Sequence, residues 1–138
     1  MAVQGGLLRM DTPGNGHIVD LTEGVISVVR TSGVQRGLVA VFATGSTVAV
    51  TTMEYEPGGV HDLQTLLDRL IPAGPEYEHN RLNHDSNAHA HLRAAVIGPS
   101  ETIPLVEGRL ALGTWQQIVL LDFDDRPRQR TVTVQVLS

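Results

Sequence analysis

The chain has 138 residues, of which 41% are hydrophobic and 18% charged, as in one globular domain covering residues 1–138. Its formal net charge of −5 argues against a nucleic-acid partner, because phosphate backbones require clustered Lys and Arg. No apolar run is long enough to span a bilayer, and the first residues lack the features of a signal peptide. The absence of cysteine excludes disulfides and cysteine-based zinc sites. We therefore expect a cytoplasmic protein with no membrane partner.

Strands and helices alternate in the first half of the chain. Residues 16–21 predict a short strand, and Thr22 is a plausible N-cap for a helix that ends at Gly33. The continuous apolar run 37–43 predicts a strand buried on both faces, and the Thr/Val alternation over 47–52 predicts another strand. A proline-glycine turn at 54–59 follows. Residues 60–71 then carry the most regular helical pattern, formed by Val60, Leu63, Leu66, Leu67 and Leu70.

The second half begins with a loop rich in histidine. Asn87 is a natural N-cap for a helix over 89–97. Strands are predicted at 101–106, 109–112, 117–124 and 131–137. Strands outnumber helices, which indicates an α+β fold with a largely antiparallel β-sheet or sandwich and two main helices. The apolar strands 37–43 and 131–137 carry few charges, so we expect an oligomer to cover their edges or faces.

The loop 77–91 holds four of the six histidines, His79, His84, His89 and His91, together with Asp85 and Asn87. Imidazole is the commonest metal ligand, and three imidazoles with an open position suit catalytic zinc. Two residues apart on a helix, His89 and His91 would point to nearly opposite faces and could not both be ligands. We therefore predict a divalent metal, most simply zinc, held by His79, His84 and His91. The alternative is a hydrogen-bonded polar loop.

The remaining candidate residues would bind substrate or move protons. His89 is assigned to proton transfer, and Asp85 to fixing an imidazole tautomer. Glu54 beside the proline-glycine turn is either a base or a solvated carboxylate. Arg109, Gly113, Thr114 and Asn87 are assigned to substrate binding. Alternatively, Gly113 is a bulge and Trp115 a core residue.

Arginine provides every fixed positive side-chain charge, because the chain contains no lysine. Arg126, Arg128 and Arg130 lie beside three aspartates, which indicates a solvated turn where their charges are neutralised. Arg109 is then the best candidate to grip a phosphate through two parallel hydrogen bonds. The alternative is an ion pair with Glu107 or Glu101.

Residues 100–118, which include Gly108-Arg-Leu-Ala-Leu-Gly-Thr-Trp-Gln-Gln-Ile118, closely resemble the signature of the YjbQ family. This family is also called the UPF0047 or secondary thiamine-phosphate synthase family. Residues 77–79 and 87–91 match it too, as does the order of the elements, so the resemblance covers roughly residues 15–137. Many members carry His-Thr-Ser-Ala where this chain has Thr44-Gly45-Ser46-Thr47, and Thr44 cannot replace an imidazole as a zinc ligand. The third metal ligand is therefore left open.

The resemblance implies an α+β fold, a homotrimer with sites near subunit boundaries, and zinc held by histidines such as His79 and His91. It also implies weak thiamine-phosphate synthase activity, which joins a hydroxymethylpyrimidine diphosphate to a thiazole phosphate and releases pyrophosphate. The leading hypothesis is therefore a small metal-binding enzyme acting on a phosphorylated small molecule. The alternatives are a non-catalytic trimeric metal- or ligand-binding protein and a metal-dependent hydrolase.

Overall fold

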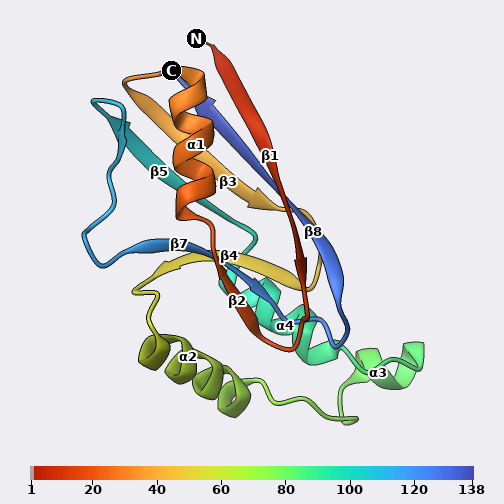
Figure 1. Ribbon diagram of the computed structural model, residues 1–138. Helices are drawn as coiled ribbons and strands as arrows, with labels where there is room; N and C mark the ends of the chain where they lie inside the picture. Colours follow the sequence, from red (N-terminus) through yellow and green to blue (C-terminus); the bar gives the residue numbers. More distant parts are fainter. Residues whose placement is uncertain (1) are drawn as a thin grey trace.

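The structure is a computed structural model that describes residues 2–138, and it confirms the α+β prediction (Figure 1). The first half contains β1 (Val3–Thr12), β2 (His17–Asp20), α1 (Thr22–Ser32), β3 (Gly37–Ala43), β4 (Val48–Met53) and α2 (Pro57–Leu70). The second half contains α3 (Glu78–Asn83), α4 (Ala88–Ile97), β5 (Ser100–Val106), β6 (Arg109–Leu110), β7 (Gln117–Asp122) and β8 (Arg128–Leu137). No helix in residues 2–138 has the length and apolarity to cross a membrane.

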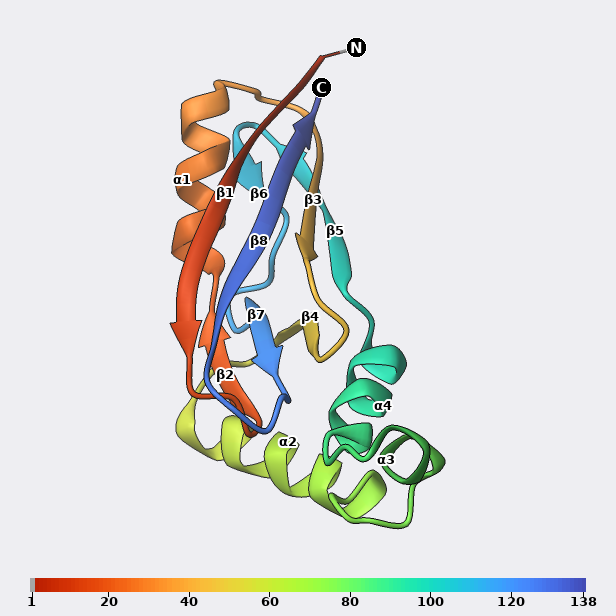
Figure 2. The same cartoon turned by 90° about the vertical axis from the view of Figure 1, so that its right-hand side faces the viewer.

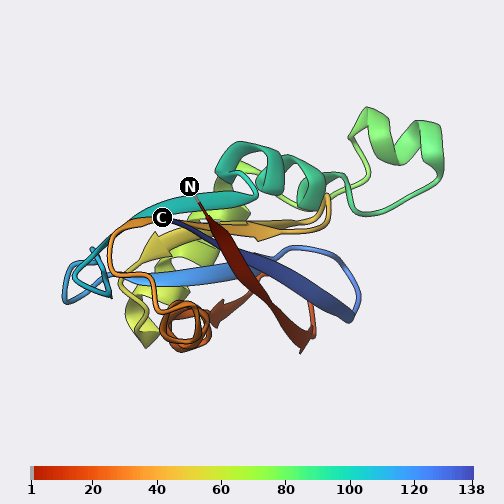
Figure 3. The same ribbon diagram turned by 90° about the horizontal axis from the view of Figure 1, so that it is seen from above.

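Two antiparallel sheets organise the fold, one in the order β1-β8-β3-β5-β6 and one in the order β2-β7-β4. Helix α1 runs along the five-stranded sheet and is seen end-on against its strands in Figure 3. Its buried residues Val25 and Val29 pack with Val39, Val41 and Val132. Helices α2 and α4 cover the smaller sheet at the other end of the molecule (Figure 2). Burial of each such side chain contributes about 1.5–3 kcal/mol.

Strand β1 was not among the predicted elements. It pairs with β8 along its whole length, from Val3 opposite Leu137 to Thr12 opposite Arg128. Its sequence gives a weak signal, because Gly5 and Gly6 interrupt the apolar pattern. The same glycines serve close packing, since a Cβ on Gly5 would lie 2.5 Å from the carbonyl oxygen of Val134. Tertiary pairing, rather than local propensity, therefore forms this strand.

The prediction that strand 37–43 is buried on both faces is wrong for a single chain. Val39 and Val41 face the core, whereas Leu38 and Phe42 face outward and are 48% and 46% exposed. The strand register places an apolar row across the outer face of the sheet, formed by Val3, Leu137, Leu38 and Pro104. We call this row, with the neighbouring Leu7 and Phe42, the outer sheet face. It is apolar and lacks a partner within residues 2–138.

The helix boundaries differ from the predictions at the turn before α2 and in the histidine-rich loop. Helix α2 begins at Pro57 rather than Val60, because the Glu56 carboxylate accepts the N–H groups of Gly58 and Gly59. The predicted turn is thus a capped helix start with proline in the first turn. The predicted loop contains the short helix α3. Several strand ends also move, and β6 has only two residues.

The predicted solvated turn at 122–130 is instead a buried ionic network. The Arg130 guanidinium donates to both oxygens of Asp122, at 2.7 and 2.8 Å, and Asp122 is 0% exposed. Arg128 Nε donates to Asp124 Oδ2 at 2.7 Å, so the predicted neutralisation is confirmed for Arg128 and Arg130. It is wrong for Arg126, which is exposed and has no ion pair within residues 2–138. Burial alone would raise the pKa of Asp124, but hydrogen bonds from Arg128 and the Asp125 backbone outweigh it and leave that pKa below its usual range.

Candidate functional site

The structure separates the predicted site residues into two groups at opposite ends of the molecule. One group lies on and around α3 and α4, and the other on β6 and the loop before β7; Figure 2 shows β6 at one end of the molecule and α3 and α4 at the other. The first contains His79, His84, Asp85, Asn87, His89 and His91, and the second Arg109, Gly113, Thr114 and Glu54. One copy of the chain does not bring them together.

His79 on α3 and His91 on α4 form a close imidazole pair, with ring centroids 4.7 Å apart and an interplanar angle of 64°. The buried side chain of Asn80 holds the two helices in this arrangement. Its Oδ1 accepts the N–H of Ala88 at the start of α4 at 3.0 Å, and its Nδ2 donates to the Gly74 carbonyl at 2.8 Å. We call His79, His91 and their polar neighbours the histidine cluster. Asn80 was not among the predicted site residues, because it belongs to no recognisable motif.

Neighbouring groups orient both rings of the histidine cluster. Nδ1 of His91 lies 3.1 Å from the Ser46 carbonyl oxygen. A carbonyl only accepts, so Nδ1 carries the proton and Nε2 retains a lone pair. Nε2 of His79 lies 3.1 Å from Asn87 Oδ1 and 3.7 Å from Asp85 Oδ2. Asn87 is the N-cap residue of α4, as predicted, but its side chain makes no capping bond and holds His79 instead.

The loop 44–47 places further polar groups beside His91. Gly45 and Ser46 line a hollow of 290 Å³ with His91, and their N–H groups have no acceptor within residues 2–138. Gly45 has φ 145°, a conformation that favours glycine, and a Cβ there would lie 3.0 Å from Arg130 Nη1. Free N–H groups and a hydroxyl next to an imidazole lone pair are suited to an anionic group.

His89 occupies a different environment from His79 and His91. It is 8% exposed, and its Nδ1 has no hydrogen-bond partner within residues 2–138. Burial, and then the positive charge of Arg93, lower the pKa of His89, so the ring is neutral at pH 7. As predicted for residues two apart, His89 and His91 lie on different faces of α4. His89 therefore packs inside the protein, and His91 is the ring that lines a hollow.

Replacing His89 with leucine should make stability less dependent on pH. In the unfolded chain the imidazole takes up a proton near a pH of about 6.5, whereas the folded protein resists this until lower pH. The free energy of unfolding of the wild type should therefore fall as pH drops below about 6.5. Urea denaturation at several pH values tests this. The variant should lose part of the fall, and parallel pH curves for the two proteins would contradict the assignment.

The predicted three-histidine metal site does not fit this arrangement. His84 is exposed at the left-handed C-cap of α3 and makes no hydrogen bond with residues 2–138. Residues 2–138 contain no group of three His, Asp or Glu side chains arranged to hold a metal ion. Nε2 of His79 is engaged with Asn87, and Thr44 offers no imidazole as a further ligand.

All members of the second group except Glu54 line a pocket of 660 Å³ at the other end of the molecule, within the usual size range of small-molecule sites. Arg30, in the last turn of α1, and Arg109 both line it, with Gly113 and Thr114. The alternative ion pair of Arg109 with Glu107 or Glu101 is not formed, and neither arginine has an ion-pair partner within residues 2–138. We call this the arginine pocket.

The loop before β7 forms one wall of the arginine pocket, and Gln116 fixes its shape. Gln116 accepts the N–H of Gly113 at 3.1 Å and donates to Thr52 Oγ1 at 2.9 Å. Trp115 is 73% exposed, so the alternative in which it is a core residue is wrong. Glu54 lines an adjoining hollow with Trp115 and Thr114. Glu54 is exposed and belongs with the arginine pocket, away from the histidine cluster.

Comparison with known proteins finds a consistent set of relatives. The family model described as UPF0047 protein YjbQ-like matches residues 7–138. A UPF0047 protein from Archaeoglobus fulgidus is 41% identical over 130 residues, covering 94% of this chain and 98% of the relative. Another from Methanothermobacter thermautotrophicus is 36% identical, covering 94% of this chain and 88% of the relative.

Solved structures agree with the sequence matches. A hypothetical protein from Aeropyrum pernix K1 superposes with a TM-score of 0.90 at 36% identity, covering 100% of this chain and 99% of its own. A YbjQ-like protein of unknown function from Sulfolobus solfataricus P2 superposes with a TM-score of 0.89 at 31% identity, covering 99% of each chain.

Proposed function

The chain belongs to the UPF0047, YjbQ-like family, and from this premise we propose that it is an enzyme acting on a phosphorylated small molecule. The reaction class is that of thiamine-phosphate synthase, in which an activated hydroxymethylpyrimidine diphosphate joins a thiazole phosphate and pyrophosphate leaves. The observation that carries the proposal is the arginine pocket, a space of 660 Å³ lined by two arginines that have no ion-pair partner within residues 2–138. Arginine is suited to this role because its planar fork binds phosphate through parallel hydrogen bonds.

In this proposal, Arg109 and Arg30 bind the phosphate groups and stabilise the departing pyrophosphate. The thiazole nitrogen forms the new bond with its own lone pair as the C–O bond to pyrophosphate breaks, so the only proton needed is one for the departing pyrophosphate. His91 would take up this proton from solvent at Nε2 and donate it to a pyrophosphate oxygen, because its Nδ1 is held by the Ser46 carbonyl and the ring lines a hollow. If His79 takes up a proton, the Asp85 carboxylate would stabilise its charge, because Asp85 Oδ2 lies 3.7 Å from His79 Nε2. The free N–H groups of Gly45 and Ser46 offer a second place for a phosphate oxygen.

The histidine cluster and the arginine pocket lie at opposite ends of one copy and would not both contact one small molecule. We therefore propose a homotrimer in which they come from different copies. The arginine pocket of one copy then faces the histidine cluster of the next. The outer sheet face supports this, since an exposed apolar row that includes Leu38 and Val3 requires a cover. The binding of a divalent metal, most simply zinc, stays a prediction. Elemental analysis of the purified protein tests it.

Replacing Arg109 with lysine should weaken the binding of pyrophosphate by about 1.5–3 kcal/mol, because the charge remains but the bidentate contact is lost. Isothermal titration calorimetry with pyrophosphate measures this. Arg36→Lys is the matched control, since Arg36 lies outside the arginine pocket and should leave affinity unchanged. Unchanged affinity with a lower melting temperature would make Arg109 structural. If the wild type binds pyrophosphate but does not join the two substrates, the alternative of a non-catalytic binding protein is favoured.

A further inference from the structure

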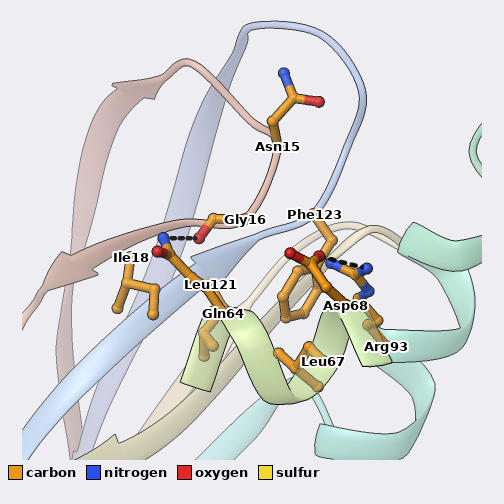
Figure 4. Close-up of a pocket in the computed structure, with 9 residues that line it drawn as sticks. All are labelled: Asn15, Gly16, Ile18, Gln64, Leu67, Asp68, Arg93, Leu121 and Phe123. Carbon is orange, nitrogen blue, oxygen red and sulfur yellow. Dashed lines mark hydrogen bonds and ion pairs between the residues drawn. The ribbon is translucent and has the colours of Figure 1, made fainter. Parts of the chain in front are cut away.

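A small cavity between α2, α4 and the smaller sheet lies apart from the arginine pocket and the histidine cluster and shares no residue with either (Figure 4). Its volume is 160 Å³. An apolar cavity of about 150 Å³ in a protein core accommodates benzene. Polar groups form the larger part of its lining, and apolar side chains form one wall. The polar residues are Asn15, Gln64, Asp68 and Arg93, and the apolar wall is formed by Ile18, Leu67, Leu121 and Phe123. It therefore has the size and lining for a single aromatic ring with a polar end.

Arg93 is the cavity's unusual residue, because its charged side chain is only 7% exposed. Its Nε and Nη2 donate to the Ile71 carbonyl at the end of α2, at 3.0 and 2.8 Å, and Nη2 also donates to Asp68 at 3.1 Å. The guanidinium carbon lies 5.8 Å from the centre of the Phe123 ring. These contacts leave Nη1 with no acceptor in residues 2–138, although a guanidinium has five N–H donors.

Acceptors stand next to this free donor. Asp68 uses Oδ1 for Arg93, and no hydrogen bond within residues 2–138 uses its Oδ2. Its side chain is 72% exposed, so the carboxylate lies at the mouth of the cavity. Gln64 donates its Nε2 to the Gly16 carbonyl at 2.9 Å, which leaves its Oε1 as a second acceptor. A donor and acceptors thus lie side by side around an aromatic wall, and the Arg93–Asp68 pair is already charge-neutral.

We propose that this cavity is a binding site for a small, flat, uncharged aromatic amide. The ring would occupy the space against Phe123 and Leu67. The amide oxygen would accept from Arg93 Nη1, and the amide nitrogen would donate to Asp68 or Gln64. An acid of the same shape binds more weakly beside the Asp68 carboxylate, because it replaces a donor with a second negative charge. This inference is independent of the proposed enzyme function.

Comparing benzamide with benzoate distinguishes an amide-binding site from an unoccupied cavity and from an anion-binding site. The experiment titrates each compound into the full-length protein by NMR. Benzamide should show nuclear Overhauser contacts between its ring protons and the side chains of Leu67 and Phe123. Benzoate should bind at least about tenfold more weakly than benzamide. Asp68→Asn should weaken the binding of benzamide and strengthen the binding of benzoate. The preference for the amide over the acid should therefore become smaller or reverse. Asp62→Asn, on the same helix but outside the cavity, should behave as the wild type.

The proposal is overturned if benzamide makes no contact with Leu67 or Phe123, because the cavity then holds water only. Equal affinities for the amide and the acid would also overturn it. So would an Asp68→Asn protein that discriminates between them as strongly as Asp62→Asn. Both variants are exposed carboxylate-to-amide changes, with Asp68 and Asp62 side chains 72% and 85% exposed, so each should fold normally.

Discussion

Replacing Arg130 with methionine should lower the free energy of unfolding by about 3–5 kcal/mol, because breaking a buried ion pair leaves an uncompensated charge. Asp122 is 0% exposed, and Arg130 donates to both of its oxygens. Arg130 Nη2 also donates to Thr47 Oγ1 at 2.7 Å, next to the loop that contacts His91. Urea denaturation followed by circular dichroism measures the loss.

Arg128→Met is the matched control for this prediction. Arg128 pairs with Asp124 in the same segment, but its own side chain is 40% exposed. Asp124 is 1% exposed, but without Arg128 it still has Arg130 Nη2 at 3.8 Å, so its charge is not left unpaired. Arg128→Met should therefore lower the free energy of unfolding clearly less than Arg130→Met does. Removing both buried charges, in Asp122→Leu with Arg130→Met, should recover part of the loss, since no unpaired charge remains. Equal losses for the two arginine variants would show that burial of the pair does not determine stability.

Replacing Leu38 with glutamate should dissociate the proposed trimer while leaving the fold of each chain intact. Leu38 is 48% exposed in the single chain, so glutamate is tolerated there. In the proposed trimer the same position is covered, and an unpaired buried charge costs several kcal/mol. Light scattering at micromolar concentration should give the mass of a trimer for the wild type and of a monomer for Leu38→Glu.

Leu70→Glu is the control for the outer sheet face. Leu70 is 67% exposed at the end of α2, away from the apolar row. This variant should remain a trimer. A monomeric wild-type protein, or dissociation by both substitutions to the same extent, would remove the outer sheet face as the subunit contact.

The sequence predicted the fold well wherever the pattern was local. The leucine spacing of α2 and the Thr/Val alternation of β4 gave the correct elements, because side chains there repeat with the helix or strand period. Strand β1 was missed because Gly5 and Gly6 serve pairing with β8, which lies more than a hundred residues away. Helix α3 was missed because Asn80 contacts residues beyond it to hold the segment in place.

The candidate site was predicted less completely, because residue types do not show which side chains meet. His79, Asp85, Asn87 and His91 do come together. His89 and His84 do not join them, since one packs inside the protein and the other ends α3. The order of residues along the chain also gave no sign that Arg109 lies at the opposite end from these histidines.

The most direct test of the central proposal mixes two inactive variants. His91→Ala and Arg109→Ala proteins are unfolded together, reassembled in equal amounts and assayed for joining of the pyrimidine diphosphate to the thiazole phosphate. In a cyclic trimer with shared sites, about three quarters of the assemblies are mixed and each has one intact site, so about one quarter of the wild-type rate should return. A mixture as inactive as its components, with an active wild type reassembled in the same way, would contradict a site shared between copies, and an inactive wild type would contradict the enzyme itself.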